Sequence, residues 1–233
     1  MKRKILLLAI FILWLTGVQA QAIIYVPNDG DTGWQTFSFT FPYEFTGSLQ
    51  FVVSDYGDYS VSSYLLIDNL STGPSGNTGF EKGDLTGYQS NGTVSVVTNF
   101  YNSGNGASYT PTEGSYMALL DSVYGDTGYS TSNLGGYDGS ILSWNNVNLS
   151  AGYTFTFDWA FATTDYCPYY DFASFIIEGQ YSTPSGTTKV FEEYKLAQIN
   201  PNPVPEPITL ILFGSGLIGI SSRGLLRKRK FNK

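Results

Sequence analysis

The chain contains no histidine and only one cysteine among its 233 residues. Without histidine, Ser–His–Asp and Cys–His catalysis are impossible, as are histidine-based zinc or iron sites. Cys167 cannot form an internal disulfide, and we expect it to be buried beside Tyr166 and Pro168. A glycoside hydrolase needs only two carboxylates, but among 19 acidic residues some pair reaches a suitable spacing by chance. Since no catalytic motif is present either, we expect a protein that is not an enzyme.

Positive charge is scarce outside the two ends of the chain. Of the 12 lysines and arginines, three lie in residues 2–4 and six lie from Arg223 onward, which leaves only Lys82, Lys189 and Lys195 between them. All 19 acidic residues belong to that intervening part, which therefore carries a net charge of −16 instead of the −7 of the whole chain. Such an acidic domain cannot bind nucleic acid by neutralising phosphates. Its carboxylates are of the kind that Ca²⁺ prefers.

The N-terminus has the three parts of a secretory signal peptide. Residues 2–4 are basic, Ile5 to Leu15 are apolar, and Val18 and Ala20 place small residues at the −3 and −1 positions of a cleavage site. We expect residues 1–20 to enter the Sec translocon and to be removed by signal peptidase. The alternative is an N-terminal membrane anchor, which the short apolar run and the cleavage site disfavour.

The C-terminus combines a proline-rich spacer, an apolar run and a basic end. Prolines keep the spacer 201–207, with its triplet Pro205-Glu206-Pro207, out of helical conformation. The following residues 208–226 are nineteen in number and contain one charge, close to the ~20 that cross a bilayer as a helix. The basic residues 227–233 are then expected in the cytoplasm. An ordinary tail anchor would explain the apolar run and the basic end equally well.

The ordered combination of triplet, glycine-containing apolar run and basic cluster resembles the PEP-CTERM sorting signal, which also carries the label ice-binding protein C-terminal domain. We see no regular threonine array of the kind that ice binding needs. The resemblance implies recognition by an exosortase, a membrane protease-transpeptidase of Gram-negative bacteria that make exopolysaccharide. The chain would cross the inner membrane, be cut near Pro205, Glu206 and Pro207, and be released or attached at the cell surface or in the extracellular matrix.

Residues 21–200 have the pattern of an all-β domain. Short runs of aromatic and β-branched residues are separated by Gly, Asn, Asp and Ser, without a long 3.6-residue period. Two runs alternate cleanly, so that Phe37, Phe39 and Phe41 should share one face, and the odd-numbered positions 153–159 another. The expected strands are 36–41, 49–53, 64–67, 93–98, 116–120, 153–159, 172–178 and 189–194. Their regular spacing favours an antiparallel β-sandwich or jelly roll, with surface loops around 102–107 and 124–139.

Three stretches resemble the jelly-roll modules of PEP-CTERM proteins and of carbohydrate-binding modules: Gly79–Tyr88, Pro111–Leu120 and Phe157–Phe175. A fourth, Gly33–Leu70, resembles the end of such a module although it precedes them here. The order predicts a circularly permuted module, in which residues 22–72 supply the last strands and 77–199 the first. The alternative is two independent halves, which we disfavour because ~50 residues bury little surface alone.

The same resemblance implies two kinds of site. In carbohydrate-binding jelly rolls a structural Ca²⁺ is held by the residues that correspond to Glu81 and Asp68, and Asp84 lies close to Glu81 in sequence. Each of these residues is equally explained as a turn residue. The tyrosines at positions 166, 169, 170 and 181 are candidates for stacking on sugar rings, and half-buried strand surfaces would explain them as well. The expected function is a non-catalytic envelope or matrix protein; the alternative is a carbohydrate-binding module for exopolysaccharide with structural calcium.

Overall fold

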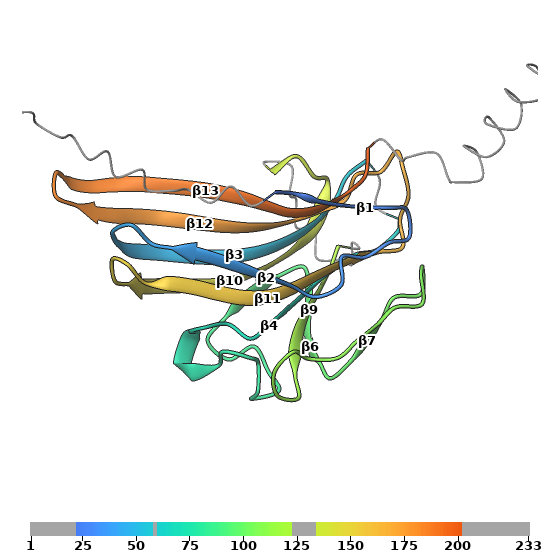
Figure 1. Ribbon diagram of the computed structural model, residues 1–233, viewed down its shortest axis with the longest axis horizontal. Coiled ribbons are helices and arrows are strands. Elements are labelled where there is room, and N and C mark those ends of the chain that lie inside the picture. Colours follow the sequence, from blue (N-terminus) through green and yellow to red (C-terminus); the bar gives the residue numbers. More distant parts are fainter. Residues whose placement is uncertain (1–21, 58–59, 123–133, 202–233) are drawn as a thin grey trace, which may run out of the picture.

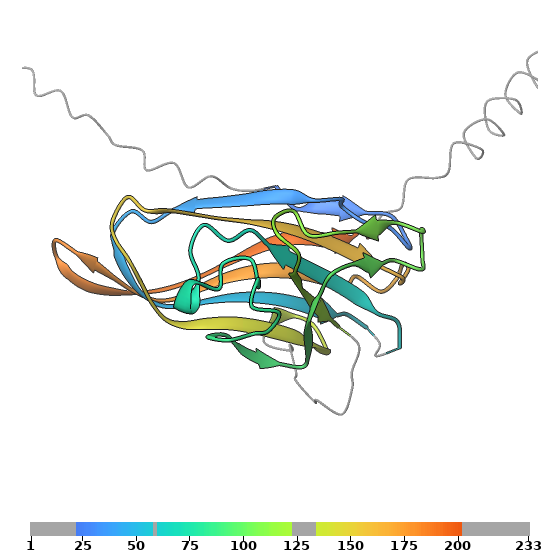
Figure 2. The same cartoon turned by 90° about the horizontal axis from the view of Figure 1, so that it is seen from below.

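The computed structural model describes residues 22–57, 60–122 and 134–201, which form two packed β-sheets (Figures 1 and 2). The first sheet has six strands in the order β1 (Ile24–Val26), β13 (Gly186–Ile199), β12 (Phe172–Thr183), β3 (Glu44–Asp55), β10 (Asp138–Leu149) and β5 (Gln89–Asn91). The second has five in the order β2 (Gln35–Thr40), β11 (Thr154–Thr163), β4 (Ser63–Asp68), β9 (Met117–Asp121) and β6 (Thr93–Val97). A separate hairpin pairs β7 (Phe100–Tyr101) with β8 (Ser108–Tyr109), and a 3₁₀ turn covers Pro74–Gly76.

The chain repeatedly crosses from one sheet to the other. It passes from β2 in the second sheet to β3 in the first and back to β4, and later from β9 through β10 and β11 to β12 in the same alternating way. All pairings in these two sheets are antiparallel except β1 with β13, whose short parallel ladder brings the beginning and the end of the domain together. The domain is therefore an all-β sandwich.

Strands from residues 24–68 belong to both sheets, and β3 and β4 lie in their interiors. In the first sheet β3 pairs with β12 on one side and with β10 on the other. In the second sheet β4 lies between β11 and β9, and β2 pairs with β11. The early and late parts of the domain consequently share both sheets and one hydrophobic core.

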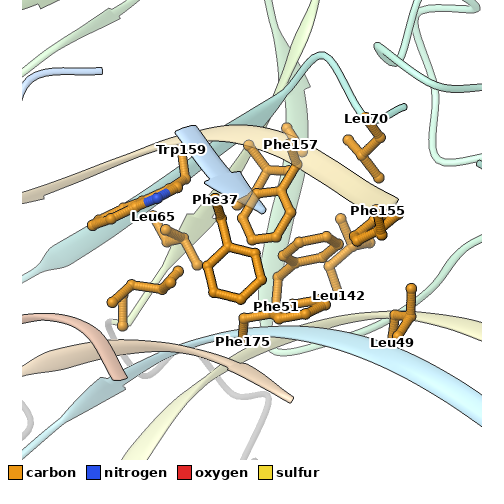
Figure 3. Packing of buried hydrophobic residues seen from close by; sticks show 14 of the residues in the cluster. Phe37, Leu49, Phe51, Leu65, Leu70, Leu142, Phe155, Phe157, Trp159 and Phe175 are labelled. Atoms are coloured by element: carbon orange, nitrogen blue, oxygen red, sulfur yellow. The ribbon is translucent and has the colours of Figure 1, made fainter. Parts of the chain in front are cut away.

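Aromatic side chains fill the space between the sheets (Figure 3). Phe37 from β2 stacks on Phe157 from β11, with ring centroids 5.0 Å apart, and Phe51 from β3 lies 5.3 Å from Phe175 of β12. The two faces predicted from alternation, Phe37 to Phe41 and Tyr153 to Trp159, both pack in this core. Burying a large aromatic side chain stabilises the fold by about 1.5–3 kcal/mol relative to leaving it exposed, so this cluster dominates the packing.

Every predicted strand overlaps an observed strand. The longest observed strand that was not predicted is β10. Its twelve residues extend from Asp138 to Leu149, whereas the loop around 124–139 was expected to include Asp138 and Gly139. The sequence signal is interrupted by Asn145 and Asn146, which look like a turn. In the structure they form a β-bulge, since Trp144 pairs with Leu49 and Val147 pairs with Gly47. Asn146 takes up the bulge with φ of 55°, a left-handed conformation that asparagine tolerates well.

Candidate functional site

Ile199 and Asn200 lie at one end of the sandwich, where two hydrogen bonds fix them. The Ile199 N–H donates to the Asp171 carbonyl at 3.0 Å, and the Asn200 N–H donates to the Val26 carbonyl at 2.8 Å. At this same end β3 stops, β10 starts and the loop 164–171 joins β11 to β12 (Figure 1). We call the region formed by residues 55–56, 137–138, 164–171 and 199–200 the exit end.

Five tyrosines cover the exit end. Three of their rings are well exposed: Tyr56 at 41%, Tyr137 at 52% and Tyr166 at 50%. The Tyr56 ring is stacked on Tyr170 with centroids 5.8 Å apart and meets the edge of Tyr137 at 6.4 Å. Tyr166 meets Tyr169 edge to face at 5.6 Å. Each exposed phenol ring is thus supported by another ring, and the surface offers both apolar faces and hydroxyl groups.

Beneath the tyrosines lie four buried aspartates: Asp55, Asp138, Asp165 and Asp171. Asp171 accepts two hydrogen bonds, since the Tyr56 N–H donates to its Oδ1 at 2.8 Å and the Ser63 hydroxyl donates to its Oδ2 at 2.7 Å. The Ser63 hydroxyl also contacts Thr163 Oγ1 at 2.7 Å. These side chains join the two sheets through a polar network at the end of the aromatic core.

Burial, and after it the neighbouring charge of Asp55, raise the pKa of Asp171 to about 9. At neutral pH, therefore, the Asp171 carboxyl keeps its proton. Because this side chain is only 1% exposed, it is not presented to a substrate in solution. The exit end accordingly exposes phenol rings on its surface, and the four aspartate carboxyl groups are buried beneath them.

The tyrosines predicted to stack on sugars divide into two groups. Tyr166, Tyr169 and Tyr170 all belong to the exit end, but of these only Tyr166 is strongly exposed. Tyr181 lies elsewhere and is buried against the core, with its ring 5.8 Å from that of Phe45. Its prediction as a sugar-stacking residue finds no support in this placement.

Tyr56 and Tyr137 were not predicted, although a repeated dipeptide in the sequence could have revealed them. Aspartate and tyrosine are adjacent at 55–56, 137–138, 165–166 and 170–171, and also at 58–59, which lies outside the described residues. In each of the four described pairs the aspartate is buried and the tyrosine lies outside it, fully or partly exposed.

Cys167 lies in the same loop and is half-buried instead of buried as expected. Its Sγ is 4.0 Å from the Tyr170 hydroxyl, and its backbone N–H donates to the Asn28 side-chain oxygen at 2.9 Å. The peptide bond to Pro168 is cis. The cysteine thus belongs to the packing of the tyrosine loop.

Two of the three predicted calcium ligands hold the loop 112–116 directly. Asp68 Oδ2 accepts the backbone N–H groups of Thr112 at 2.6 Å and Glu113 at 3.0 Å. The Glu81 carboxylate accepts the backbone N–H groups of Ser115 at 2.9 Å and Tyr116 at 3.1 Å. Burial raises the pKa of Asp68, and these backbone donors partly offset the shift. Both carboxylates act here as anchors for a loop.

Asp84, the third predicted ligand, caps its own turn by accepting the Thr86 N–H at 2.9 Å. Within the described part of the chain, no three His, Cys, Asp or Glu side chains are arranged to hold a metal ion. The calcium site therefore stays a prediction from the module resemblance.

A shallow hollow lies on the outer face of the first sheet, away from the exit end. It has a volume of about 580 Å³ and is lined by Thr46, residues 178–180 and residues 189–191. Phe191 is 58% exposed there, and Gln180 and Lys189 are paired across β12 and β13 beside it. The combination of one exposed ring and several polar side chains could accept a sugar.

Beyond Asn200 and Pro201, the chain continues into the segment that carries the sorting triplet. Residues 203–229 match the PEP-CTERM protein-sorting motif. The match includes Pro205, Glu206 and Pro207, and it confirms the prediction for this segment. The motif indicates a protein that is exported and sorted to the cell envelope by an exosortase.

No curated protein sequence and no solved structure shows significant similarity to the chain. The likeness of the sandwich to jelly-roll and carbohydrate-binding modules is thus still a prediction. The predicted signal peptide 1–20, the sorting triplet, the apolar run 208–226 and the basic end 227–233 lie outside the residues that the structure describes. None of the helices in the described ranges is long and apolar enough to cross a bilayer.

Proposed function

We propose that the protein is a non-enzymatic component of the cell surface or extracellular matrix, delivered as a membrane-anchored precursor. Residues 1–20 direct export, residues 208–226 hold the precursor in the inner membrane, and an exosortase cuts near Pro205-Glu206-Pro207. The observation that carries this proposal is the order of parts: an all-β domain fixed as far as Asn200, followed directly by the sorting motif at 203–229. No catalytic group is needed for such a role.

We further propose that the domain is a circularly permuted jelly roll. The alternation of successive strands between the two sheets supports the jelly roll. The insertion of β3 and β4 between strands of the later stretch supports the permutation. Adjacent termini make permutation physically easy, and here β1 pairs with β13.

Substitution of the triplet tests the sorting proposal. The full chain with Pro205, Glu206 and Pro207 all changed to alanine is expressed in a host that contains an exosortase, beside the unchanged chain and a Pro201→Ala control. We expect the triplet variant to stay at the membrane at its precursor mass, whereas the control is processed normally. Normal processing of the triplet variant would contradict the proposal.

The alternative function is binding of exopolysaccharide, which the hollow around Phe191 favours. Aromatic rings beside polar groups are typical of ligand sites, although this hollow is open and shallow. The test is an affinity screen of the full chain in detergent against polysaccharides from the producing cells. A hit that disappears in Phe191→Ala but persists in a Tyr43→Ala control would support this alternative, and the absence of any hit would count against it.

A further inference from the structure

The sorting tail tethers the exit end close to the lipid bilayer. Seven residues, Pro201–Pro207, separate Asn200 from the first residue of the apolar run, and four of them are prolines. Even a fully extended chain of seven residues spans at most about 25 Å. The interfacial zone of a bilayer takes up about 5–7 Å of that distance. The exit end therefore stays within about 20 Å of the lipid headgroups.

A tether of this length allows a surface with weak affinity for lipid to be bound to the bilayer for much of the time. Short linkers give effective concentrations in the millimolar range, because the partner cannot diffuse away. A surface that binds lipid too weakly to hold a free protein can thus stay docked in the precursor. It is released once the tail has been cut.

The surface that faces the bilayer has suitable chemistry. Tyrosine is enriched at membrane interfaces, since its ring is apolar and its hydroxyl can stay in the hydrated headgroup layer. The exit end presents Tyr56, Tyr137 and Tyr166, each 41–52% exposed. Contact between Tyr56 and Tyr137 and support from neighbouring rings reduce the conformational entropy lost on docking.

Charge at the exit end does not prevent this contact. The four aspartates beneath the rings are at most 6% exposed, so their carboxyl groups do not face the lipid. Asp29 is exposed nearby, and its N–H donates to the Asp165 carbonyl at 2.9 Å. Because this carboxylate weakens attraction to anionic lipid, docking must rest on burial of the rings and should change little with salt.

We propose that the exit end docks on the lipid–water interface of the precursor's membrane through Tyr56, Tyr137 and Tyr166. Docking holds the spacer 201–207 at a fixed height, where a membrane protease can reach the triplet. The inference rests on the proposed function, since it requires the tail to be inserted in the bilayer.

Chemical labelling of tyrosines in the full precursor tests this proposal. The chain is reconstituted without exosortase in vesicles of phosphatidylethanolamine and phosphatidylglycerol, and phenol groups are acetylated and quantified residue by residue by mass spectrometry. Tyr43, which is 40% exposed and lies beside Tyr181 toward the other end of β12, is the internal reference. A second precursor carries a long Gly/Ser insertion between Asn200 and Pro201, which lowers the effective concentration at the membrane.

We expect Tyr137 and Tyr166 to be labelled several-fold more slowly, relative to Tyr43, in the native precursor than in the one with the long spacer, at low and high salt alike. Equal relative labelling in the two precursors, with the chain still embedded after alkaline extraction, overturns this inference alone. Extraction of the chain from the vesicles overturns the proposed function and the inference with it. If Tyr137 and Tyr166 are protected from labelling only when exosortase is added, the tyrosine surface binds the protease, and docking on lipid is overturned.

Cleavage provides a second measurement. In membranes that contain exosortase, the double variant Tyr137→Ser/Tyr166→Ser should yield mature protein several-fold more slowly than the unchanged chain. The matched variant Tyr43→Ser/Phe191→Ser removes two similarly exposed rings outside the exit end and should be processed at the normal rate. Equal rates for both variants would show that docking does not position the triplet.

Discussion

Asp171 retains its proton at a pH where most aspartates are ionised. Its neighbours explain why: the side chain is buried, the charge of Asp55 opposes ionisation, and only the Ser63 hydroxyl and the Tyr56 N–H favour it. An aspartate in the unfolded chain loses its proton near pH 4, whereas the folded Asp171 has a pKa of about 9. Between these values the folded state binds more protons than the unfolded state, so stability falls as pH rises.

Replacement of Asp171 by asparagine should remove this pH dependence. Asparagine resembles the protonated carboxyl in shape and can still accept the Tyr56 N–H. We expect Asp171→Asn to gain stability relative to the unchanged chain as pH rises from about 5 to about 9, by up to about 1.4 kcal/mol per pH unit. The midpoint of urea unfolding measures this. Asp84→Asn, at an exposed turn, is the matched control. If the stability of the unchanged chain and that of Asp171→Asn depend on pH in the same way, Asp171 is not protonated in the folded state at neutral pH.

At the scale of elements, the bulge in β10 sets the register of the strand. Because two residues, Asn145 and Asn146, oppose one residue of β3, Val147 and Leu149 return to the core face. Without the extra residue both side chains would point to solvent. The alternation rule failed for β10 because the bulge breaks the two-residue period, and two asparagines in sequence look like a turn.

A β-branched residue at the bulge should therefore destabilise the domain. Asn146 has φ of 55°, and a β-branched side chain in this left-handed region costs about 1–2 kcal/mol. We expect Asn146→Val to lower the unfolding free energy by about that amount, and Asn146→Gly to be neutral. Asn148→Val, at an exposed position of the same strand, is the control. Chemical denaturation that finds equal stability for Asn146→Val and Asn148→Val would refute this role for the bulge.

The loop 112–116 is anchored by the carboxylate of Glu81. Loss of its carboxylate in Glu81→Ala should speed hydrogen exchange of the Ser115 and Tyr116 amides by several-fold to about tenfold, as expected for hydrogen bonds worth about 0.5–1.5 kcal/mol. The neighbouring Lys82→Ala serves as control. An unchanged exchange rate in Glu81→Ala would show that Glu81 does not anchor the loop. If added Ca²⁺ slows exchange of these amides in the unchanged chain, that result would support the calcium site.

At the scale of the whole molecule, the sorting signal near the C-terminus was the part most readily predicted. It is a continuous stretch whose meaning depends on local composition, and the match at 203–229 confirms it. The signal peptide at 1–20 stays a prediction. The clean alternation in β2 and β11 likewise predicted two faces of the core. The exit end was harder, because Tyr56, Tyr137 and Tyr166 come from three separate segments that only the sheet pairing brings together.

The described part of the molecule is an acidic sandwich, and seven residues separate Asn200, which pairs with Val26, from the apolar run of the tail. The central claim is that this tail is a temporary anchor, cut near Pro205-Glu206-Pro207 by an exosortase. The most direct test is the intact mass of the protein recovered from a host with exosortase, compared with the same host without it. We predict a product that ends near the triplet and lacks residues 208–233 only when exosortase is present. A chain that retains the complete tail in both hosts would contradict the claim.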